Sequence, residues 1–235
     1  MIAAHTLRDY LREQSLDLDL TQVQVAAITL AAVLAVPKAP VDRDLFRFPV
    51  PPLGENGACS LVDELADEPY DLSPWFGGET EAARAALTDL SALIDSTNRQ
   101  VGADWLGIYA VRGEGEEARL VKMAYHGRPS RAEFPLTESF AEISNNSRVG
   151  LSGWGAVIDD VAEWSQMGGG YYQCDAAVQS EVCLPVLDHE GRVLGIIDAE
   201  ASERAFFDPA RQVWLAALAI VLAKPLAELP FVADE

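Results

Sequence analysis

Two cysteines lie nine positions apart in the stretch GYYQCDAAVQSEVCLPV, which spans residues 170–186. Cys174 and Cys183 are interspersed with two carboxylates, Asp175 and Glu181. An ionised thiol is both a nucleophile and a redox group. The stretch is therefore either a reactive site or a loop that runs into a core strand.

Strand alternation assigns several carboxylates to one surface, because successive side chains of a β-strand point to opposite faces. In SEVCLPV, Glu181 and Cys183 share one face, and the apolar residues of the run take the face expected to meet helices. In GIIDAEA, Asp198 and Glu200 share a face, and antiparallel pairing brings them next to Glu181. Three carboxylates are thus predicted to converge.

An aromatic wall is predicted beside these acids, since Trp105 and Tyr109 share a face of the strand in DWLGIYA. Buried carboxylates that converge repel one another unless a cation, a proton or hydrogen bonds satisfy them. A free amino acid would bring an ammonium group for the acids and for cation–π contact with the rings. The alternative is that Asp198 and Glu200 lie near an exposed strand end and are solvated.

The elements that must position these residues indicate an α+β fold. Helical spacing over residues 5–36 and a Pro-rich stretch over 37–78 precede a helix that starts near Glu79. Five strand-like runs follow, the last two flanking the turn DHEGRV. A final helix begins with Asp208 as its cap and Pro209 at its first position. We expect an antiparallel sheet with helices on one face.

A long crossover, residues 141–179, joins the third strand to this hairpin and is expected to roof a ligand pocket on the other face of the sheet. A glycine run within it is expected to act as a hinge that lets Tyr171 close over the pocket. Residues 1–78 are interpreted as a helical and Pro-rich extension of a domain at 79–235. The extension is expected to pack on the domain or to mediate a homodimer.

Composition excludes several partners. The 235 residues carry a net charge of −20, which repels nucleic acid and anionic membrane surfaces. The longest apolar stretch, 23–36, is shorter than the roughly 20 residues of a membrane-spanning helix, and no signal sequence is visible, so we expect a cytoplasmic protein. The three cysteines form no C-x-x-C pair and the histidines are scattered, so neither a metal site nor a cofactor is predicted.

The run YYQCDAAVQSEVCLPVLDHEGRVLGIIDAEAS resembles the core of GAF domains, and within them the free methionine-(R)-sulfoxide reductases. The family segment reads Cys-Asp-Ala-Ala, then Ser-Glu-x-x-Leu-Pro, then Gly-x-x-x-Gly-x-x-Asp-x-Asp/Glu. The likeness extends to DWLGIYAVRG and LVKMAYHG and covers about residues 85–225. The N-terminal extension lies outside it.

The resemblance implies a GAF-like pocket for free methionine sulfoxide. Its walls would be Trp105 and Tyr109, and its acids Glu181, Asp198 and Glu200, with Asp175 next to the reactive thiol. In that chemistry the thiol at the position of Cys174 attacks sulfur while an acid protonates the sulfoxide oxygen, which leaves a sulfenic acid. A second thiol then closes a disulfide, which an external, thioredoxin-like dithiol reduces.

The chain departs from the family at two further cysteines. Arg131 stands in RAEFPL and Trp154 stands in SGWG where the family has a thiol, so both are assigned to the ligand site. Arg131 is expected to bind the carboxylate of the ligand or to favour the thiolate of Cys174. The alternative is a solvated arginine at a strand edge.

With both familiar partners absent, Cys183 is a candidate resolving thiol, since it shares the pocket face with Glu181. The alternative is a small core thiol, because free cysteine is among the most buried residues. Cys59 and an outside thiol are further candidates. The sequence therefore leaves two functions open: a methionine sulfoxide reductase acting through Cys174, or a non-catalytic GAF sensor for an amino-acid-like metabolite.

Overall fold

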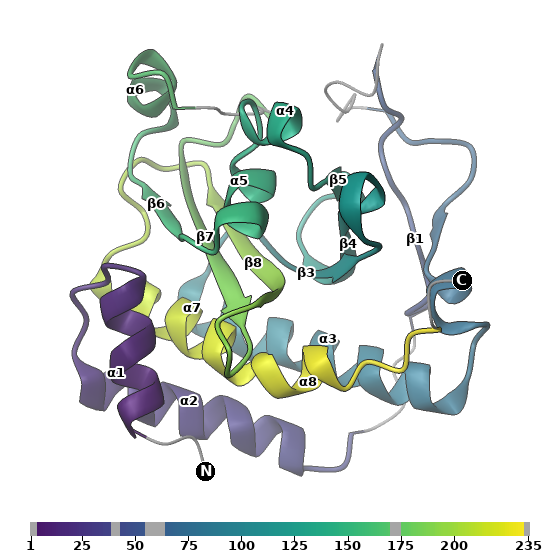
Figure 1. The fold of residues 1–235 in the computed structure, drawn as a ribbon, viewed down its shortest axis with the longest axis horizontal. Coiled ribbons are helices and arrows are strands. Elements are labelled where there is room, and N and C mark those ends of the chain that lie inside the picture. Colours follow the sequence, from purple (N-terminus) through teal and green to yellow (C-terminus); the bar gives the residue numbers. More distant parts are fainter. Residues whose placement is uncertain (1–3, 39–42, 55–63, 170–174, 233–235) are drawn as a thin grey trace.

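A six-stranded antiparallel sheet forms the centre of the computed structural model, which describes residues 4–38, 43–54, 64–169 and 175–232 (Figure 1). The order of strands across the sheet is β5-β4-β3-β8-β7-β6. Their bounds are β3 (Trp105–Arg112), β4 (Arg119–His126), β5 (Glu133–Pro135), β6 (Ala156–Ile158), β7 (Ser180–Leu187) and β8 (Val193–Ala201). The five predicted strands are confirmed, whereas the short edge strand β6, inside the crossover, was not anticipated.

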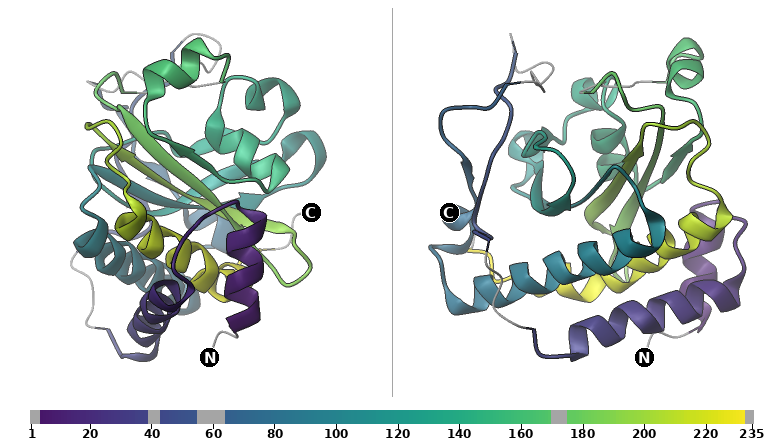
Figure 2. Two further views of the ribbon diagram at one scale, coloured as in Figure 1. Left: turned by 90° about the vertical axis from the view of Figure 1, so that its left-hand side faces the viewer. Right: turned by 180° about the vertical axis from the view of Figure 1, so that it is seen from behind.

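Helices cover one face of the sheet, as predicted (Figure 2). The helices of this layer are α1 (Ala4–Glu13), α2 (Leu20–Ala35), α3 (Glu81–Val101), α7 (Pro209–Val221) and α8 (Ala223–Ala227). The expected cap is present, because the Asp208 side chain accepts a hydrogen bond from the Arg211 backbone amide and Pro209 follows it. Helix α3 ends at Gly102, whose φ of 70° favours glycine.

The N-terminal extension shares the core of the sheet domain. Helix α2 packs on α7 and α3, and Leu30 of α2 is fully buried. The Pro-rich segment adds a small hairpin of β1 (Arg47–Phe48) with β2 (Tyr70–Asp71), followed by the 3-10 helix η2 (Ser73–Phe76). Its aromatic side chains enter the same cluster of buried residues as the strands and the helix layer. The extension therefore packs on the domain, one of the two expected arrangements.

The opposite face of the sheet is roofed by the crossover, as the sequence predicted (Figure 2). Three short helices were not anticipated: α4 (Glu138–Ala141) leads into the crossover, and α5 (Asn145–Ser152) and α6 (Val161–Gln166) lie within it. Helix α5 contacts both β7 and β8. Another short element, the 3-10 helix η3 (Gly115–Glu117), lies in the turn between β3 and β4.

Helix α1 ties the helix layer to this roof. The Tyr10 hydroxyl donates to the backbone oxygen of Pro185 in β7 at 2.8 Å. The Gln14 side chain bridges two roof positions, donating to the oxygen of Gly153 at 3.0 Å and accepting from the amide of Gly155 at 2.6 Å. A Cβ at Gly155 would lie 2.6 Å from Leu184 Cδ2, so a larger residue there would displace the Leu184 side chain.

The C-terminal stretch 209–227 is apolar and long enough to cross a membrane by length and composition alone. Helix α7, which makes up most of it, packs against α2, α3 and β7. Burial between the sheet and α2 accounts for its apolar composition.

The shared core predicts that truncating α2 destabilises the whole chain. We expect Leu30→Ala to lower the free energy of unfolding by about 2–5 kcal/mol, because Leu30 is fully buried. Ile28→Ala on the exposed side of the same helix should change it by about 0.5 kcal/mol or less. Urea denaturation followed by circular dichroism measures both. Equal effects of the two substitutions would contradict a shared core.

Candidate functional site

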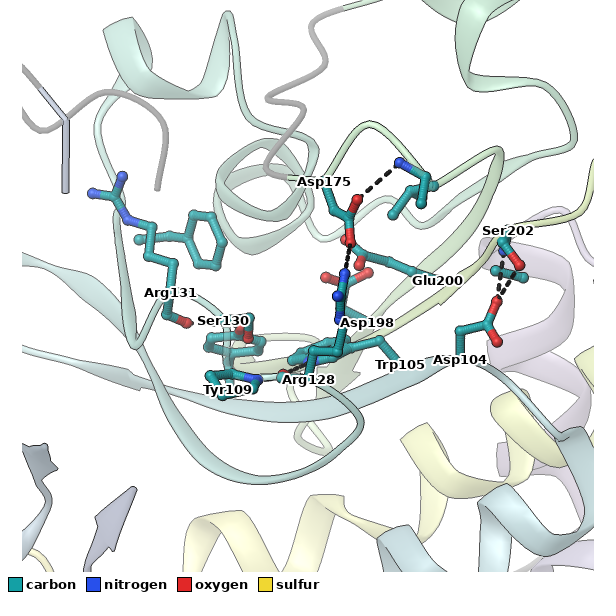
Figure 3. Close-up of a pocket in the computed structure, with 15 residues that line it drawn as sticks. Asp104, Trp105, Tyr109, Arg128, Ser130, Arg131, Asp175, Asp198, Glu200 and Ser202 are labelled. Carbon is teal, nitrogen blue, oxygen red and sulfur yellow. Dashed lines mark hydrogen bonds and ion pairs between the residues drawn. The ribbon is translucent and has the colours of Figure 1, made fainter. Parts of the chain in front are cut away.

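A cavity of about 290 Å³ opens between the sheet and the loops above it (Figure 3). Strands β3 and β8 supply its floor, and the segment between β4 and β5 and the segment before β7 supply its sides. It is lined by Asp104, Trp105, Tyr109, Arg128, Pro129, Ser130, Arg131, Phe134, Asp175, Ala177, Val178, Asp198, Glu200, Ala201 and Ser202. The predicted pocket on the crossover face is thus present.

The aromatic wall of this cavity is formed by Trp105 and Tyr109, whose ring centroids are 6.1 Å apart. The Trp105 Nε1 donates to the backbone oxygen of Arg128, and the Tyr109 hydroxyl donates to that of Arg131, both at 3.2 Å. A Cβ at Gly107 would lie 2.1 Å from the Trp105 ring. Glycine at this position therefore lets the indole lie across the strand.

The carboxylates converge as strand alternation predicted. Glu181 pairs with Glu200, and Cys183 pairs with Asp198, across the β7–β8 ladder. The side chains of Glu181 and Asp198 are buried, at 3% and 2% exposure, and Glu200 is partly buried. The alternative of a solvated strand end is wrong for Asp198. Asp198 and Glu200 line the cavity, whereas Glu181 and Cys183 do not.

Two asparagines at the start of α5 bind these acids, and the sequence analysis did not identify them. Asn146 Nδ2 donates to Asp198 Oδ2 at 2.9 Å, and the Asn145 amide donates to Glu181. Arg148, one turn later, donates to the Asn145 side-chain oxygen. The only available signal was the polar run NNSR in an insertion relative to the resembled family.

Arg131 lines the cavity, as its assignment to the ligand site predicted, but its guanidinium does not face the acids, and Trp154 lies elsewhere. The Arg131 guanidinium points away from Asp198 and Glu200 (Figure 3). It donates to the backbone oxygen of Glu133 and lies over the rings of Phe134 and Phe140.

Trp154 is 64% exposed and is not among the cavity residues. Because the flanking Gly153 and Gly155 are held by Gln14, the chain leaves α5 toward α1 and turns the indole to solvent. The assignment of Trp154 to the pocket was therefore wrong.

Arg128 places a cation at the mouth of the cavity. This residue was not predicted from the sequence. Its guanidinium is exposed and lies 3.4 Å from Asp175 Oδ2 (Figure 3). Asp175 lines the cavity, as its assignment to the ligand site predicted. Cys174 and Tyr171, together with Cys59, fall outside the described residues.

Sequence comparison finds distant relatives. No protein-family model matches the chain. Protein YtsP of Bacillus subtilis is 28% identical over 145 residues, which cover 61% of this chain and 80% of that protein. Free methionine-R-sulfoxide reductase of Saccharomyces cerevisiae is 22% identical over 140 residues, covering 59% of this chain and 72% of the yeast protein.

Solved structures share the fold. Type II free methionine-R-sulfoxide reductase from Thermoplasma acidophilum matches with a TM-score of 0.54 at 23% identity, covering 65% of this chain and 99% of that chain. A provisionally named GAF sensor protein from Burkholderia vietnamiensis matches with a TM-score of 0.52 at 16% identity, covering 89% of this chain and 96% of its own. The chain contains a GAF-like domain. It is related, at low identity, to free methionine-R-sulfoxide reductase and to YtsP.

Electrostatics in the GAF-like domain favour the protonated forms of Asp198 and Glu200. Burial raises the pKa of Asp198 well above its usual value, the charges of Glu181 and Glu200 raise it further, and the Asn146 hydrogen bond lowers it in part. Burial and the charges of Glu181 and Asp175 raise the pKa of Glu200 to about 8, against the opposing effect of Lys122. The cluster is therefore suited to donate a proton or to bind a cationic ligand.

Cys183 lies at the bottom of this cluster and is fully buried. Burial raises its pKa well above the usual value, and the charges of Asp198 and Glu181 add to the effect. One ligand atom each from Glu181, Cys183 and Asp198 lies within 4.8 Å of the others, which is close enough to hold a metal ion. These residues come from two strands and follow no spacing motif, so the sequence did not predict a metal site.

The raised pKa of Glu200 predicts a pH-dependent stability. The unfolded chain releases this proton near pH 4.5, whereas the folded chain keeps it to about pH 8, so stability falls as pH rises through this window. Glu200→Gln removes the difference. Between about pH 5 and pH 8 we expect the wild type to lose at least about 1.4 kcal/mol more unfolding free energy than the variant, the equivalent of one pKa unit.

Urea denaturation at about pH 5 and pH 8 measures these unfolding free energies. The matched control is Glu203→Gln, which removes an exposed carboxylate just after β8 and should follow the wild type. Parallel pH profiles of wild type and Glu200→Gln would show that Glu200 titrates as a solvated acid.

Proposed function

We propose that this protein binds free methionine sulfoxide in the cavity and reduces its R epimer through Cys174. The observation that carries the proposal is the meeting of buried acids with an aromatic wall in one cavity of a GAF-like domain. The similarity to free methionine-R-sulfoxide reductase of yeast and of T. acidophilum supports the same substrate class.

The charges around the cavity suit a free amino acid. Asp198 offers a carboxylate to the ammonium group, while Glu200 keeps its proton for the sulfoxide oxygen. Arg128 offers a guanidinium to the ligand carboxylate. Trp105 and Tyr109 suit the apolar carbons of the methionine sulfoxide side chain and the cationic end. Arg128 thereby takes the role expected of Arg131, whose guanidinium is engaged away from the acids.

The proposed chemistry begins at Cys174, the residue before cavity-lining Asp175. Its sulfur attacks the sulfoxide sulfur while a protonated carboxyl group of the cluster protonates the sulfoxide oxygen. The oxygen passes to Cys174 as a sulfenic acid, and free methionine leaves. The raised pKa of Glu200, about 8, makes it the suitable proton donor at neutral pH.

An external dithiol completes the cycle in this proposal. One of its thiols condenses with the sulfenic acid and releases water, and its second thiol reduces the mixed disulfide. Cys183 is less suited to this step, because it is fully buried, does not line the cavity and has a raised pKa. A thiol held in its protonated form attacks slowly.

Steady-state assays with free methionine-(R)-sulfoxide and dithiothreitol test the proposal. We expect turnover by the wild type and none by Cys174→Ser. Glu200→Gln removes the proton donor and should lower kcat/KM by about 100-fold or more, the contribution of a general acid. The S epimer and Glu203→Gln serve as controls for the substrate and the enzyme.

The state of Cys174 after one turnover shows whether an external thiol or Cys183 reacts with its sulfenic acid. After one turnover without reductant, dimedone labelling and peptide mass mapping should find a sulfenic acid on Cys174. A disulfide between Cys174 and Cys183 would instead make Cys183 the resolving thiol.

The second candidate function is a GAF module that binds the amino acid without reducing it. It is favoured by the two positions where the resembled family carries thiols, which here hold the engaged Arg131 and the exposed Trp154. Calorimetric binding of methionine sulfoxide, weakened by Glu200→Gln but without turnover, would establish this function in place of the reductase.

A further inference from the structure

Beneath the cavity, three potential metal ligands meet at the β7–β8 ladder. Glu181 and Cys183 come from β7 and Asp198 from β8, and one ligand atom of each lies within 4.8 Å of the others. All three side chains are buried, at 3%, 0% and 2% exposure. Among the residues that the structure describes, this is the one such group of histidine, cysteine and carboxylate side chains.

Two oxygens beside this group have no hydrogen-bond partner among the described residues. They are Asp198 Oδ1 and Asn146 Oδ1, on side chains that are 2% and 7% exposed. Asn146 Nδ2 binds the other oxygen of Asp198 at 2.9 Å, so the Asn146 side chain lies against one member of the group. A buried acceptor without a donor is costly, and a coordinated cation removes the cost.

We propose that Cys183, Glu181 and Asp198 bind one Zn²⁺-like transition-metal ion, with Asn146 Oδ1 as the fourth ligand. The site goes beyond the proposed reductase function and does not require it. A thiolate among oxygen ligands suits a borderline-soft ion such as Zn²⁺, whereas Ca²⁺ and Mg²⁺ prefer oxygen alone.

The spacing of the ligand atoms is compatible with this ion. Zn–S and Zn–O bonds of about 2.3 and 2.1 Å place tetrahedral ligands about 3.3–3.8 Å apart. The ligand atoms lie up to 4.8 Å apart, so side-chain movements of about 1 Å bring them to the spacing that tetrahedral Zn²⁺ requires. Binding the ion also removes the mutual repulsion of the carboxylates and stabilises the thiolate.

The position of the ion makes it a competitor of an amino-acid ligand. Asp198 belongs both to the metal group and to the lining of the cavity, so the ion reaches its ligands through the cavity. An ammonium group and a metal ion would then contend for the same carboxylate. Occupancy by one ligand lowers the apparent affinity for the other.

The test uses a Cys59→Ser/Cys174→Ser background, in which Cys183 is the remaining thiol of the chain. Titration calorimetry with zinc chloride should give one site per chain. Titration with Co²⁺ should give a thiolate-to-cobalt charge-transfer band. We expect Cys183→Val to abolish the band, and Cys183→Val and Asp198→Asn each to weaken Zn²⁺ binding at least about 10-fold.

Two controls keep the outcome decisive in so acidic a chain. Glu203→Gln makes at the surface the same change from carboxyl to amide that Asp198→Asn makes inside, and it should leave the Zn²⁺ affinity unchanged. Zn²⁺ should also protect Cys183 in the background protein from alkylation in mild urea, with protection lost on adding EDTA, a readout that needs no substitution at the site.

Absence of a single site, or a cobalt spectrum that survives Cys183→Val, would overturn the proposal, as would alkylation of Cys183 at an unchanged rate with Zn²⁺. Because the background lacks Cys174, these results are independent of whether the protein reduces methionine sulfoxide.

Discussion

The pairing of β7 with β8 is the constraint on which the site depends. Its register sets Glu181 opposite Glu200 and Cys183 opposite Asp198, so that three acids and a thiol share one face. A slip of one residue would turn all of them toward the helices and expose the apolar set. The helix layer prevents that slip, because Val182, Leu184 and Ile197 are buried in the core on the opposite face.

The buried acids of the cluster repel one another, and hydrogen bonds from the roof offset only part of this repulsion. Asparagines of α5 donate to Glu181 and Asp198, and Arg148 is placed one turn beyond them. Each amide satisfies one oxygen, and Asp198 Oδ1 is left without a partner among the described residues. An unfilled acceptor in a cavity lined by rings is typical of a site that receives a ligand.

The extension contributes to this architecture from the far side of the sheet. Helix α2 closes the helix layer, and α1 contacts strand β7 through Tyr10 and the roof through Gln14. The same contacts that hold Gly153 and Gly155 turn Trp154 outward. The N-terminal helices therefore influence the shape of the roof without lining the cavity.

The sequence by itself determined five of the six strands of the sheet, the capped helices and the facing of Glu181, Asp198 and Glu200, because alternation and caps are local properties of the chain. It did not reveal the amides of α5 or the role of Arg128, and it misplaced Trp154. Those depend on which segments of a long crossover meet the sheet. Only the tertiary structure decided them, because contacts between residues far apart in the chain leave no local pattern to read.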